Sequence, residues 1–376
     1  MPSASLDGFT IGVTAARCAE EQIFHLLQWG ANVFPAPMLR SVALGDGDEL
    51  TRQTEATIVL RPEVAIFTTA HGLRSWFESA AAAGLEDALF EVLSSASVWC
   101  RGRKTVGAAA ALGLDAERVA EDTATLLTLL ATEAHRSRAV IQLDGAGLHP
   151  LAHDVRASGV ELLAVEVYRY EPPLDIEPAR RLVAAIVDGQ MDAVTFTSRP
   201  AVQMLAEVAD SLGLLAPTIE AFHSRCVPVC IGSMCAAAAD SIGVVEPLVP
   251  RQPRLGSMVR TITAYFSGRH RSYLVGTTTV AVQGRLVVVD NLRVMLTDRE
   301  RNLLHALLDA SGAIRSKEDL LRSVWRMETD AHVVEVNVAR LRQRLGPAAE
   351  GIETVFRRGY RWAGVVDVDA RTGTDH

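Results

Sequence analysis

Long hydrophobic runs and cysteines are both scarce in this sequence of 376 residues. The longest apolar stretch without a charge covers residues 226–239, contains a proline and a glycine, and is too short to cross a bilayer. The first residues, MPSASLDGFTIGV, lack a basic start followed by an apolar run, so we expect no signal peptide. Five cysteines over this length do not form a disulfide framework. These absences favour a soluble protein of the cytoplasm that does not interact with membranes.

Aromatic residues make up only 5% of the chain, but 49% of the residues are hydrophobic and 22% are charged. This is the composition of a globular protein and excludes a disordered or collagen-like chain. The length exceeds that of one ordinary domain, so we expect two or three.

An excess of basic charge is absent from most of the chain. Residues 1–275 carry 22 Lys+Arg against 31 Asp+Glu, whereas residues 276–376 carry 15 against 14. Six arginines and three glutamates lie within residues 331–362, the only basic concentration. We therefore expect only the C-terminal part to bind a polyanion.

An internal repeat spans the first 250 residues. Three segments recur in order: 9–38 as 139–168, 65–78 as 193–207, and 106–114 as 231–244. Each copy combines apolar strands with amphipathic or small-residue helices. Gly30 and Gly159 are 129 residues apart, as are Phe67 and Phe196. Such regular spacing indicates a duplicated unit.

Short apolar strands that alternate with helical patterns predict an α/β fold of two similar lobes, each a parallel sheet with helices on both faces. Ligands of such sheets bind beyond the carboxyl ends of the strands, where helix N-termini present free N–H groups. Small or hydroxylic residues occupy these ends: Thr14, Thr68, Thr69, Thr197, Ser198, Gly232 and Ser233. Helix capping is the alternative explanation for the serines and threonines.

The pattern changes after a linker at residues 267–275. Three short alternating strands within residues 277–297 predict an antiparallel meander. Thr297 and Glu300 have capping-box spacing and open a helix. A second helix starts at Ser316, a third covers about residues 330–345, and residues 352–364 predict a β-hairpin.

The third of these helices has two distinct faces. Apolar residues recur at core spacing: Val334, Val338, Leu341 and Leu345. A second face with the same spacing carries Val333, Asn337, Arg340 and Arg344. Arginine matches guanine and asparagine matches adenine in the major groove, so this face suits DNA recognition. A solvated, arginine-rich surface is the alternative.

Short motifs of the C-terminal part decide between these alternatives. They are Leu296-Thr297-x-x-Glu300, SKEDLL at 316–321, Val324-Trp325, VEVNV at 334–338, Arg340-Leu341-Arg342, Thr354-Val355 and Gly359-Tyr360-Arg361. Over about 85 residues the sequence resembles the winged-helix DNA-binding domain of OmpR/PhoB-type response regulators. That family binds double-stranded DNA, with dimers expected on tandem half-sites.

The resemblance assigns roles to individual residues. It implies that Arg340 contacts bases and that Thr354 reaches DNA from the wing. It also implies backbone contacts by Trp325, His332, Val333, Asn337, Arg342 and Tyr360. In the wing, Phe356 stands where the family has an arginine, and Arg357 and Arg358 follow it. These two arginines suit a minor-groove or phosphate contact.

Motifs in the duplicated part carry a second resemblance. They are Ile11-Gly12-Val13-Thr14, Ile66-Phe67-Thr68-Thr69, Arg103-Lys104-Thr105-Val106-Gly107, Val167-Tyr168-Arg169-Tyr170, Phe196-Thr197-Ser198 and Ile231-Gly232. The pattern is similar to uroporphyrinogen-III synthase, a two-lobed α/β enzyme without a cofactor. It implies a domain at 1–266, with one lobe at about 1–38 and 171–266 and the other at about 39–170. The winged helix would occupy 276–366 and a disordered tail 367–376.

The synthase family closes hydroxymethylbilane to uroporphyrinogen III with loss of water and inversion of ring D. The resemblance implies that Tyr168 assists departure of the hydroxyl as a proton donor. Because the substrate carries eight carboxylates, Arg17, Arg103 and Lys104 are candidate ligand-binding residues. Several family turns are altered. The family often has Thr-Arg after its first strand, where this chain has Thr14-Ala15, and its Gly-Pro-x-Thr turn begins here with Gly232-Ser233. We expect no metal site, because the cysteines at 226, 230 and 235 lack paired spacing.

Together these observations predict a transcriptional regulator whose synthase-like domain is a sensor. The effector would be a tetrapyrrole or a smaller anion. Because uroporphyrinogen III leads to sirohaem, the cofactor of nitrite reductase, nitrate and nitrite assimilation genes are the expected targets. An active synthase that carries a regulatory DNA-binding domain is the alternative.

Overall fold

The computed structural model describes residues 6–16, 18–44, 48–133, 136–143, 145, 151–267, 269–325 and 330–366. The chain forms two compact units. The first consists of residues 1–39 and 173–376, and the second consists of residues 40–172. Among the described residues, no helix is long and apolar enough to span a membrane. The tail predicted at residues 367–376, Arg17 and the loop at 326–329 lie outside the described residues.

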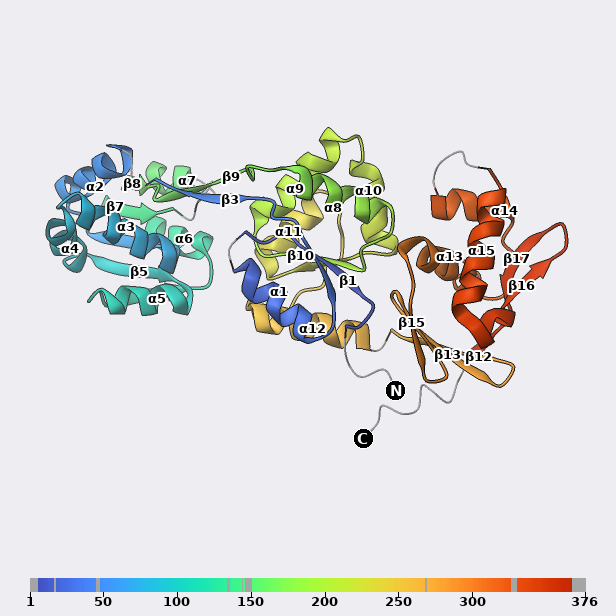
Figure 1. The fold of residues 1–376 in the computed structure, drawn as a ribbon. Coiled ribbons are helices and arrows are strands. Elements are labelled where there is room, and N and C mark those ends of the chain that lie inside the picture. The colour runs from blue at the N-terminus through green and yellow to red at the C-terminus, as the bar shows by residue number, and fades with distance from the viewer. Residues whose placement is uncertain are drawn as a thin grey trace. The chain divides into compact units, whose positions relative to one another are not determined.

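The first unit contains a four-stranded parallel sheet drawn from two distant parts of the chain (Figure 1). Its order is β11 (Val227–Cys230), β10 (Ala193–Phe196), β1 (Thr10–Val13) and β2 (Asn32–Pro35). Its helices are α1 (Ala19–Gln28), α8 (Glu177–Val187), α9 (Arg199–Ser211), α10 (Leu215–Ser224), α11 (Ser233–Ser241) and α12 (Leu255–Ser267). Ile11 and Val13 of β1 pack in one cluster with Met258 and Ile262 of α12. We call this part of the first unit lobe 1.

The second unit, lobe 2, contains a five-stranded parallel sheet. Its order is β6 (Ala116–Ala120), β5 (Ser97–Arg101), β4 (Val64–Phe67), β7 (Arg138–Gln142) and β8 (Glu161–Val165). The helices are α2 (Asp48–Leu60), α3 (Ala70–Ala82), α4 (Glu86–Ser94), α5 (Gly102–Ala111), α6 (Thr123–Glu133) and α7 (Ala152–Ala157). An antiparallel pair, β3 (Arg40–Ala43) and β9 (Tyr168–Glu171), completes it.

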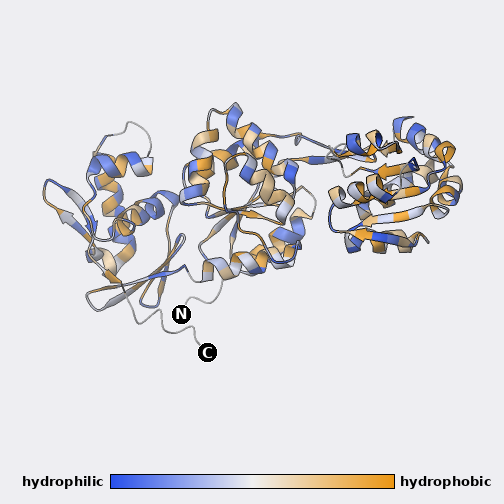
Figure 2. Cartoon of the chain, turned by 180° about the vertical axis from the view of Figure 1, so that it is seen from behind, coloured by the Kyte–Doolittle hydropathy of each residue, from blue (hydrophilic) through white to orange (hydrophobic). Residues whose placement is uncertain are grey.

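Residues of β4 face two hydrophobic clusters in alternation. Ala65 and Phe67 pack with Trp76 of α3, whereas Val64 and Ile66 pack with residues of α6 and α7. Side chains of a strand alternate between the two faces of a sheet, so a strand buried on both faces is apolar throughout. Figure 2 shows the hydrophobic colour along such strands and mixed colours on the covering helices. The predicted sheets with helices on both faces are confirmed.

The duplicated segments occupy matching places in the two sheets. The pair β1–β2 corresponds to β7–β8, and the pair β10–β11 corresponds to β4–β5. Gly30 and Gly159 follow equivalent helices, and both have a positive φ, 84° and 90°. The copies are exchanged between lobes, however, because β1 pairs with β10 rather than with β4.

The C-terminal domain completes the first unit; its described residues form two small sheets, three α-helices and a 3₁₀ helix. Four antiparallel strands and β18 (Val365–Val366) form one sheet: β12 (Arg271–Val275), β13 (Thr278–Gln283), β14 (Leu286–Val289) and β15 (Leu292–Met295). The helices are α13 (Asp298–Leu308), α14 (Lys317–Leu320), which continues as one π turn (Leu321–Trp325), and α15 (His332–Leu345). A 3₁₀ helix (Gly346–Gly351) precedes the hairpin of β16 (Ile352–Val355) and β17 (Gly359–Trp362).

Local signals position these elements as the sequence predicts. Thr297 and Glu300 form a complete capping box at the start of α13. Val334, Val338, Leu341 and Leu345 of α15 are buried in one core with α13. The expected linker at 267–275 differs, because residues 271–275 form β12, which pairs with β13 and β18.

Candidate functional site

The helix α15 presents a polar face beside its buried one. Arg340 is exposed, and among the described residues it has no acidic partner. Asn337 is half-buried, and its Nδ2 donates to the carbonyl oxygen of Val333 at 2.8 Å. The guanidinium of Arg344 lies 3.4 Å from the buried Glu300 carboxylate and donates to the carbonyl of Met295. The structure therefore leaves Arg340 available to a ligand and uses Arg344 to join α15 to α13.

The hairpin β16–β17, which we call the wing, is attached to α15 through three predicted residues. Arg342 donates to Thr354 Oγ1 at 2.8 Å and to the carbonyl of Ile352. Its guanidinium lies 5.9 Å from the ring centre of Tyr360, which is paired with Thr354 across the hairpin. These contacts fix the angle between helix and wing, so the three residues have a structural role whatever else they contact.

The turn of the wing carries the exposed cations. Arg357 and Arg358 are exposed, and among the described residues neither has an acidic partner. Arg357 has a positive φ of 59° and lies over the ring of Phe356, which is 80% exposed. The substitution of the family's arginine by Phe356 thus leaves two cations at the tip of the turn. Such uncompensated charges favour phosphate binding.

The start of α15 and the π turn at Leu321–Trp325 hold the remaining residues that were predicted to contact DNA. The carboxylate of Glu335 pairs with Lys317 and lies 3.2 Å from Nδ1 of His332. These bonds lower the pKa of Glu335 and raise that of Lys317. Val333 and Trp325 are half-buried, and the indole Nε1 of Trp325 is buried without a hydrogen-bond partner among the described residues.

The carboxyl ends of β10 and β11 in lobe 1 lead directly into α9 and α11. The hydroxyl of Ser198 accepts from the amide of Ala201 and caps α9. Thr14 Oγ1 donates to the carbonyl of Thr195 at 2.7 Å and is buried within the sheet. Thr197 is half-buried, Gly232 is the N-cap of α11, and Ser233 is exposed at its first turn. Capping and sheet bonding therefore occupy two of these hydroxyls, and the helix N-termini remain as donors.

The matching edge of lobe 2 has the same construction. Thr69 Oγ1 accepts from the amide of Gly72 and caps α3, while Thr68 Oγ1 donates to the carbonyl of Gln142. Arg103 and Lys104 lie exposed in the first turn of α5, and neither has an acidic partner among the described residues. Two adjacent helix N-termini and two cations favour an anionic ligand.

Tyr168 lies at this same edge but is almost completely buried, with 1% exposure. Its hydroxyl lies 3.4 Å from Thr69 Oγ1, and its ring centre is 5.2 Å from that of His71. A Cβ on Gly145 would clash with the ring, so only glycine fits there. The ring is thus part of the core, and its hydroxyl reaches the cap of α3.

Sequence reasoning missed Gln142 and Gly145, which shape this edge. The buried Gln142 ends β7, and its Oε1 accepts from the amide of Thr69 at 3.1 Å. A polar residue at the last position of an otherwise apolar strand was the available signal. Gly145 carried none, because its closeness to Tyr168 depends on tertiary packing.

The two parts of the chain match two protein families. The model of uroporphyrinogen-III synthase HemD matches residues 19–260, and that of the transcriptional regulatory protein C-terminal domain matches residues 291–362. The chain belongs to the uroporphyrinogen-III synthase HemD family and carries a C-terminal OmpR/PhoB-type DNA-binding domain. Both resemblances inferred from the sequence are confirmed.

Individual relatives cover one part or the other. A mutant uroporphyrinogen III synthase from Thermus thermophilus superposes with a TM-score of 0.57 and 27% identity, over 68% of this chain and 98% of that one. The uncharacterized protein YjjA of Bacillus subtilis is 28% identical over 54% of this chain and 75% of its own length. The transcriptional regulatory protein SrrA of Staphylococcus aureus is 37% identical over 20% of this chain and 34% of its own length.

Proposed function

We propose that this protein is a DNA-binding transcriptional regulator whose synthase-like domain is its sensor. The observation that carries the proposal is the charge of Arg340 on the exposed face of α15, together with Arg357 and Arg358 on the adjoining wing, since none of the three has an acidic partner among the described residues. A helix that bears arginine and asparagine on one face can enter the major groove, while the wing cations bind phosphates. The DNA is double-stranded, and the protein binds it as a homodimer.

The effector is an anion bound at the carboxyl ends of the parallel strands, a tetrapyrrole or a smaller carboxylate. Support comes from lobe 2, where the helix N-termini of α3 and α5 lie at the strand ends with Arg103 and Lys104, and neither cation has an acidic partner among the described residues. Lobe 1, taken by itself, has the helix N-termini of α9 and α11 at its strand ends. The target genes are those of nitrate and nitrite assimilation, because sirohaem derives from the product of the synthase family.

The proposal is tested first on DNA. Operator sequences are selected from a random library with the full chain, and binding is then measured for the Arg340→Ala variant. Loss of one bidentate base contact costs about 1–3 kcal/mol, or roughly 5- to 150-fold in affinity, and relaxes specificity at one position. Arg181→Ala, an exposed arginine of α8, is the control with unchanged binding. Equal binding by both variants would reject α15 as the recognition helix.

An active uroporphyrinogen-III synthase with a regulatory DNA-binding domain is the second candidate. The likeness to the Thermus synthase favours it, as does the placement of the Tyr168 hydroxyl near Thr69 at the ligand edge of lobe 2. Hydroxymethylbilane generated enzymatically would be supplied to the purified protein, and the isomers separated by chromatography. Type III product that disappears in Tyr168→Phe supports the enzyme. Type I product alone, which forms spontaneously, supports the sensor.

A further inference from the structure

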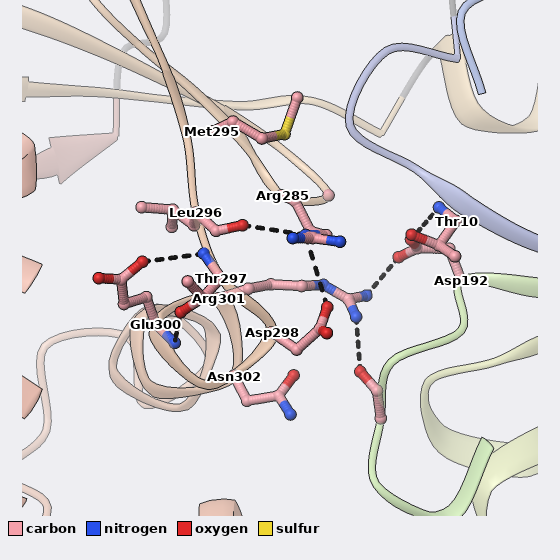
Figure 3. A network of polar contacts seen from close by, with 12 residues as sticks. Thr10, Asp192, Arg285, Met295, Leu296, Thr297, Asp298, Glu300, Arg301 and Asn302 are labelled. Atoms are coloured by element: carbon pink, nitrogen blue, oxygen red, sulfur yellow. Dashed lines mark hydrogen bonds and ion pairs between the residues drawn. The ribbon is translucent and has the colours of Figure 1, made fainter. Parts of the chain in front are cut away.

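Helix α13 of the winged-helix domain holds one turn of lobe 1 (Figure 3). The Arg301 guanidinium donates to the carbonyl of Gly189 at 2.5 Å and forms an ion pair with Asp192. Asn302 Nδ2 donates to the carbonyl of Asp188 at 2.8 Å. Three successive contacts therefore fix the turn at residues 188–192, which contains Gln190.

A second contact between lobe 1 and the winged-helix domain prevents this turn from pivoting. The amide of Arg285 donates to the carbonyl of Gly8 at 2.8 Å, and Gln283 Nε2 donates to the carbonyl of Asp7 at 3.0 Å. A Cβ on Gly8 would lie 2.5 Å from the carbonyl oxygen of Gln283, and a Cβ on Gly284 would lie 2.5 Å from the carbonyl oxygen of Gly8. The two backbones are thus in direct contact. Gln190 therefore has a defined position relative to α15.

A pocket of about 840 Å³ lies where this turn meets the DNA-recognition face. Its lining consists of Gln190, residues 297–300 at the start of α13, and Asn337, Arg340, Gln343 and Arg344 of α15. Most of these side chains are hydrogen-bond donors or cations, and they come from both lobe 1 and the winged-helix domain. The pocket is therefore polar and is shared by the two.

The charges of the pocket do not balance. Asp298 lies 3.4 Å from Arg285, and Glu300 lies 3.4 Å from Arg344, so both carboxylates are neutralised. Arg299 and Arg340 are exposed, and among the described residues neither has an acidic partner. Two uncompensated cations next to a neutral amide favour a ligand with separated negative charges.

We propose that this pocket binds a phosphodiester strand of the DNA that α15 contacts, so that Gln190 and Arg299 extend the DNA-binding surface into the synthase-like lobe. This inference rests on the proposed DNA-binding function. A helix in the major groove is flanked by the two phosphate backbones, and most protein–DNA hydrogen bonds go to them. Arg299 binds one phosphate by charge, and the Gln190 amide donates to a neighbouring phosphate oxygen. A polyphosphate or a carboxylate effector in the same pocket is the competing occupant, and the test below separates it from DNA.

Two substitutions in the full chain test the contact by affinity. Gln190→Glu keeps the size of the side chain and places a negative charge in the pocket, so we expect at least tenfold weaker binding of the selected operator. Arg299→Ala removes one phosphate contact, which lowers the slope of log K against log[salt] by about 1. The controls are Gln203→Glu on α9 and Arg181→Ala on α8, both exposed and outside the pocket. Thermal unfolding of each variant checks that the fold is kept.

Proximity gives a second measurement that does not depend on affinity. Cys18 is exposed and the other four cysteines are buried, so a Cys18→Ser background allows a single thiol to be labelled at Gln190→Cys. An iron chelate on this thiol should cut the DNA backbone at one defined position beside the recognised bases, whereas the same chelate at Gln203→Cys should not cut.

The outcomes separate failure of the inference from failure of the proposed function. If the wild type binds the operator but Gln190→Glu and Arg299→Ala behave like their controls and the chelate does not cut, the pocket does not contact DNA. Tighter binding by the Gln190 variants would also overturn the inference, because the turn would then obstruct DNA. If no DNA is selected by the wild type, the regulator itself is rejected.

Discussion

At the scale of the residue, Asp192 and Arg301 form the interaction that joins lobe 1 to the winged-helix domain. Their side chains are only 7% and 8% exposed, and Asp192 also accepts from the amide of Thr10 at 2.7 Å. Burial raises the pKa of the Asp192 carboxyl, while Arg301 and the Thr10 amide act in the opposite direction. A buried ion pair of this kind adds little to the free energy of unfolding relative to an apolar pair of similar size. The loss of one partner, however, leaves a buried charge without compensation and destabilises the fold.

The Arg301→Met variant should therefore lower the free energy of unfolding by about 3–5 kcal/mol. Arg299→Met is the matched control, since it changes an exposed arginine two residues away in the same helix and should cost less than about 0.5 kcal/mol. Urea unfolding followed by far-ultraviolet circular dichroism measures both. Similar losses for the two variants would show that the pair does not support the docked arrangement.

His305 gives the stability of this region a pH dependence. Burial lowers the pKa of His305 to about 4, assisted by the nearby charge of Arg301, and its Nε2 lies 3.2 Å from the carbonyl oxygen of Gly284. Between pH 6.5 and pH 4 the unfolded chain binds a proton at this imidazole and the folded chain does not. The stability that this group contributes is thus complete above pH 6.5 and decreases as the pH falls, by about 3 kcal/mol at pH 4. Thermal unfolding of His305→Gln across this range should show a flatter profile than the wild type.

At the scale of the element, the wing differs from α15 in what it contributes to DNA binding. Arg357 and Arg358 lie in a turn with exposed guanidinium groups, so they can neutralise phosphates without contacting bases. Arg361 of β17 is instead paired with Glu353. Under the proposed function we expect the helix to select the DNA sequence and the wing to add affinity that is independent of sequence.

A double variant, Arg357→Ala with Arg358→Ala, should therefore weaken binding of specific and unrelated DNA by the same factor. Its slope of log K against log[salt] should decrease by about 2, because each arginine neutralises one phosphate and each neutralised phosphate adds about 1 to the slope. Arg361→Ala is the control with a smaller change, because its charge is already compensated. Fluorescence anisotropy at several salt concentrations measures the slopes. A selective loss of operator binding would indicate base contacts by the wing.

At the scale of the whole molecule, lobe 1 and the winged-helix domain share buried contacts and should exchange hydrogen as one cooperative unit. The buried ion pair of Asp192 with Arg301 and the contact of Gly8 with Gly284 join them, whereas lobe 2 has its own core. Hydrogen-exchange mass spectrometry under mild denaturant should show β10 and α13 opening together. In Arg301→Met, α13 should open at lower denaturant than β10. Separate opening of the two in the wild type would contradict the shared unit.

The sequence allowed prediction of each element that has a strong local signal. The capping box at Thr297 and the apolar face of α15 follow from local spacing, the equivalence of Gly30 and Gly159 follows from the repeat, and the structure confirms all three. It did not allow prediction of β12, because the exposed Arg271 and Leu274 interrupt the pattern expected of a strand. This segment is a strand because it pairs with β13 and β18. The hydroxyls at the strand ends were also ambiguous, because Thr14 and Ser198 can bind a ligand or satisfy nearby backbone groups.

The amino-acid sequence by itself determined the duplication and the two families, because repeated segments and motifs can be recognised along the chain. It also determined the order of secondary-structure elements, because periodicity, caps and glycines act over a few residues. Tertiary structure decided which copies of the repeat share a sheet, since β1 pairs with β10 through contacts about 180 residues apart. It also decided that Arg301 forms an ion pair with Asp192 of lobe 1 and that Gln190 lines the same pocket as Arg340. These last contacts depend on burial of groups distant in the chain, for which local sequence carries no signal.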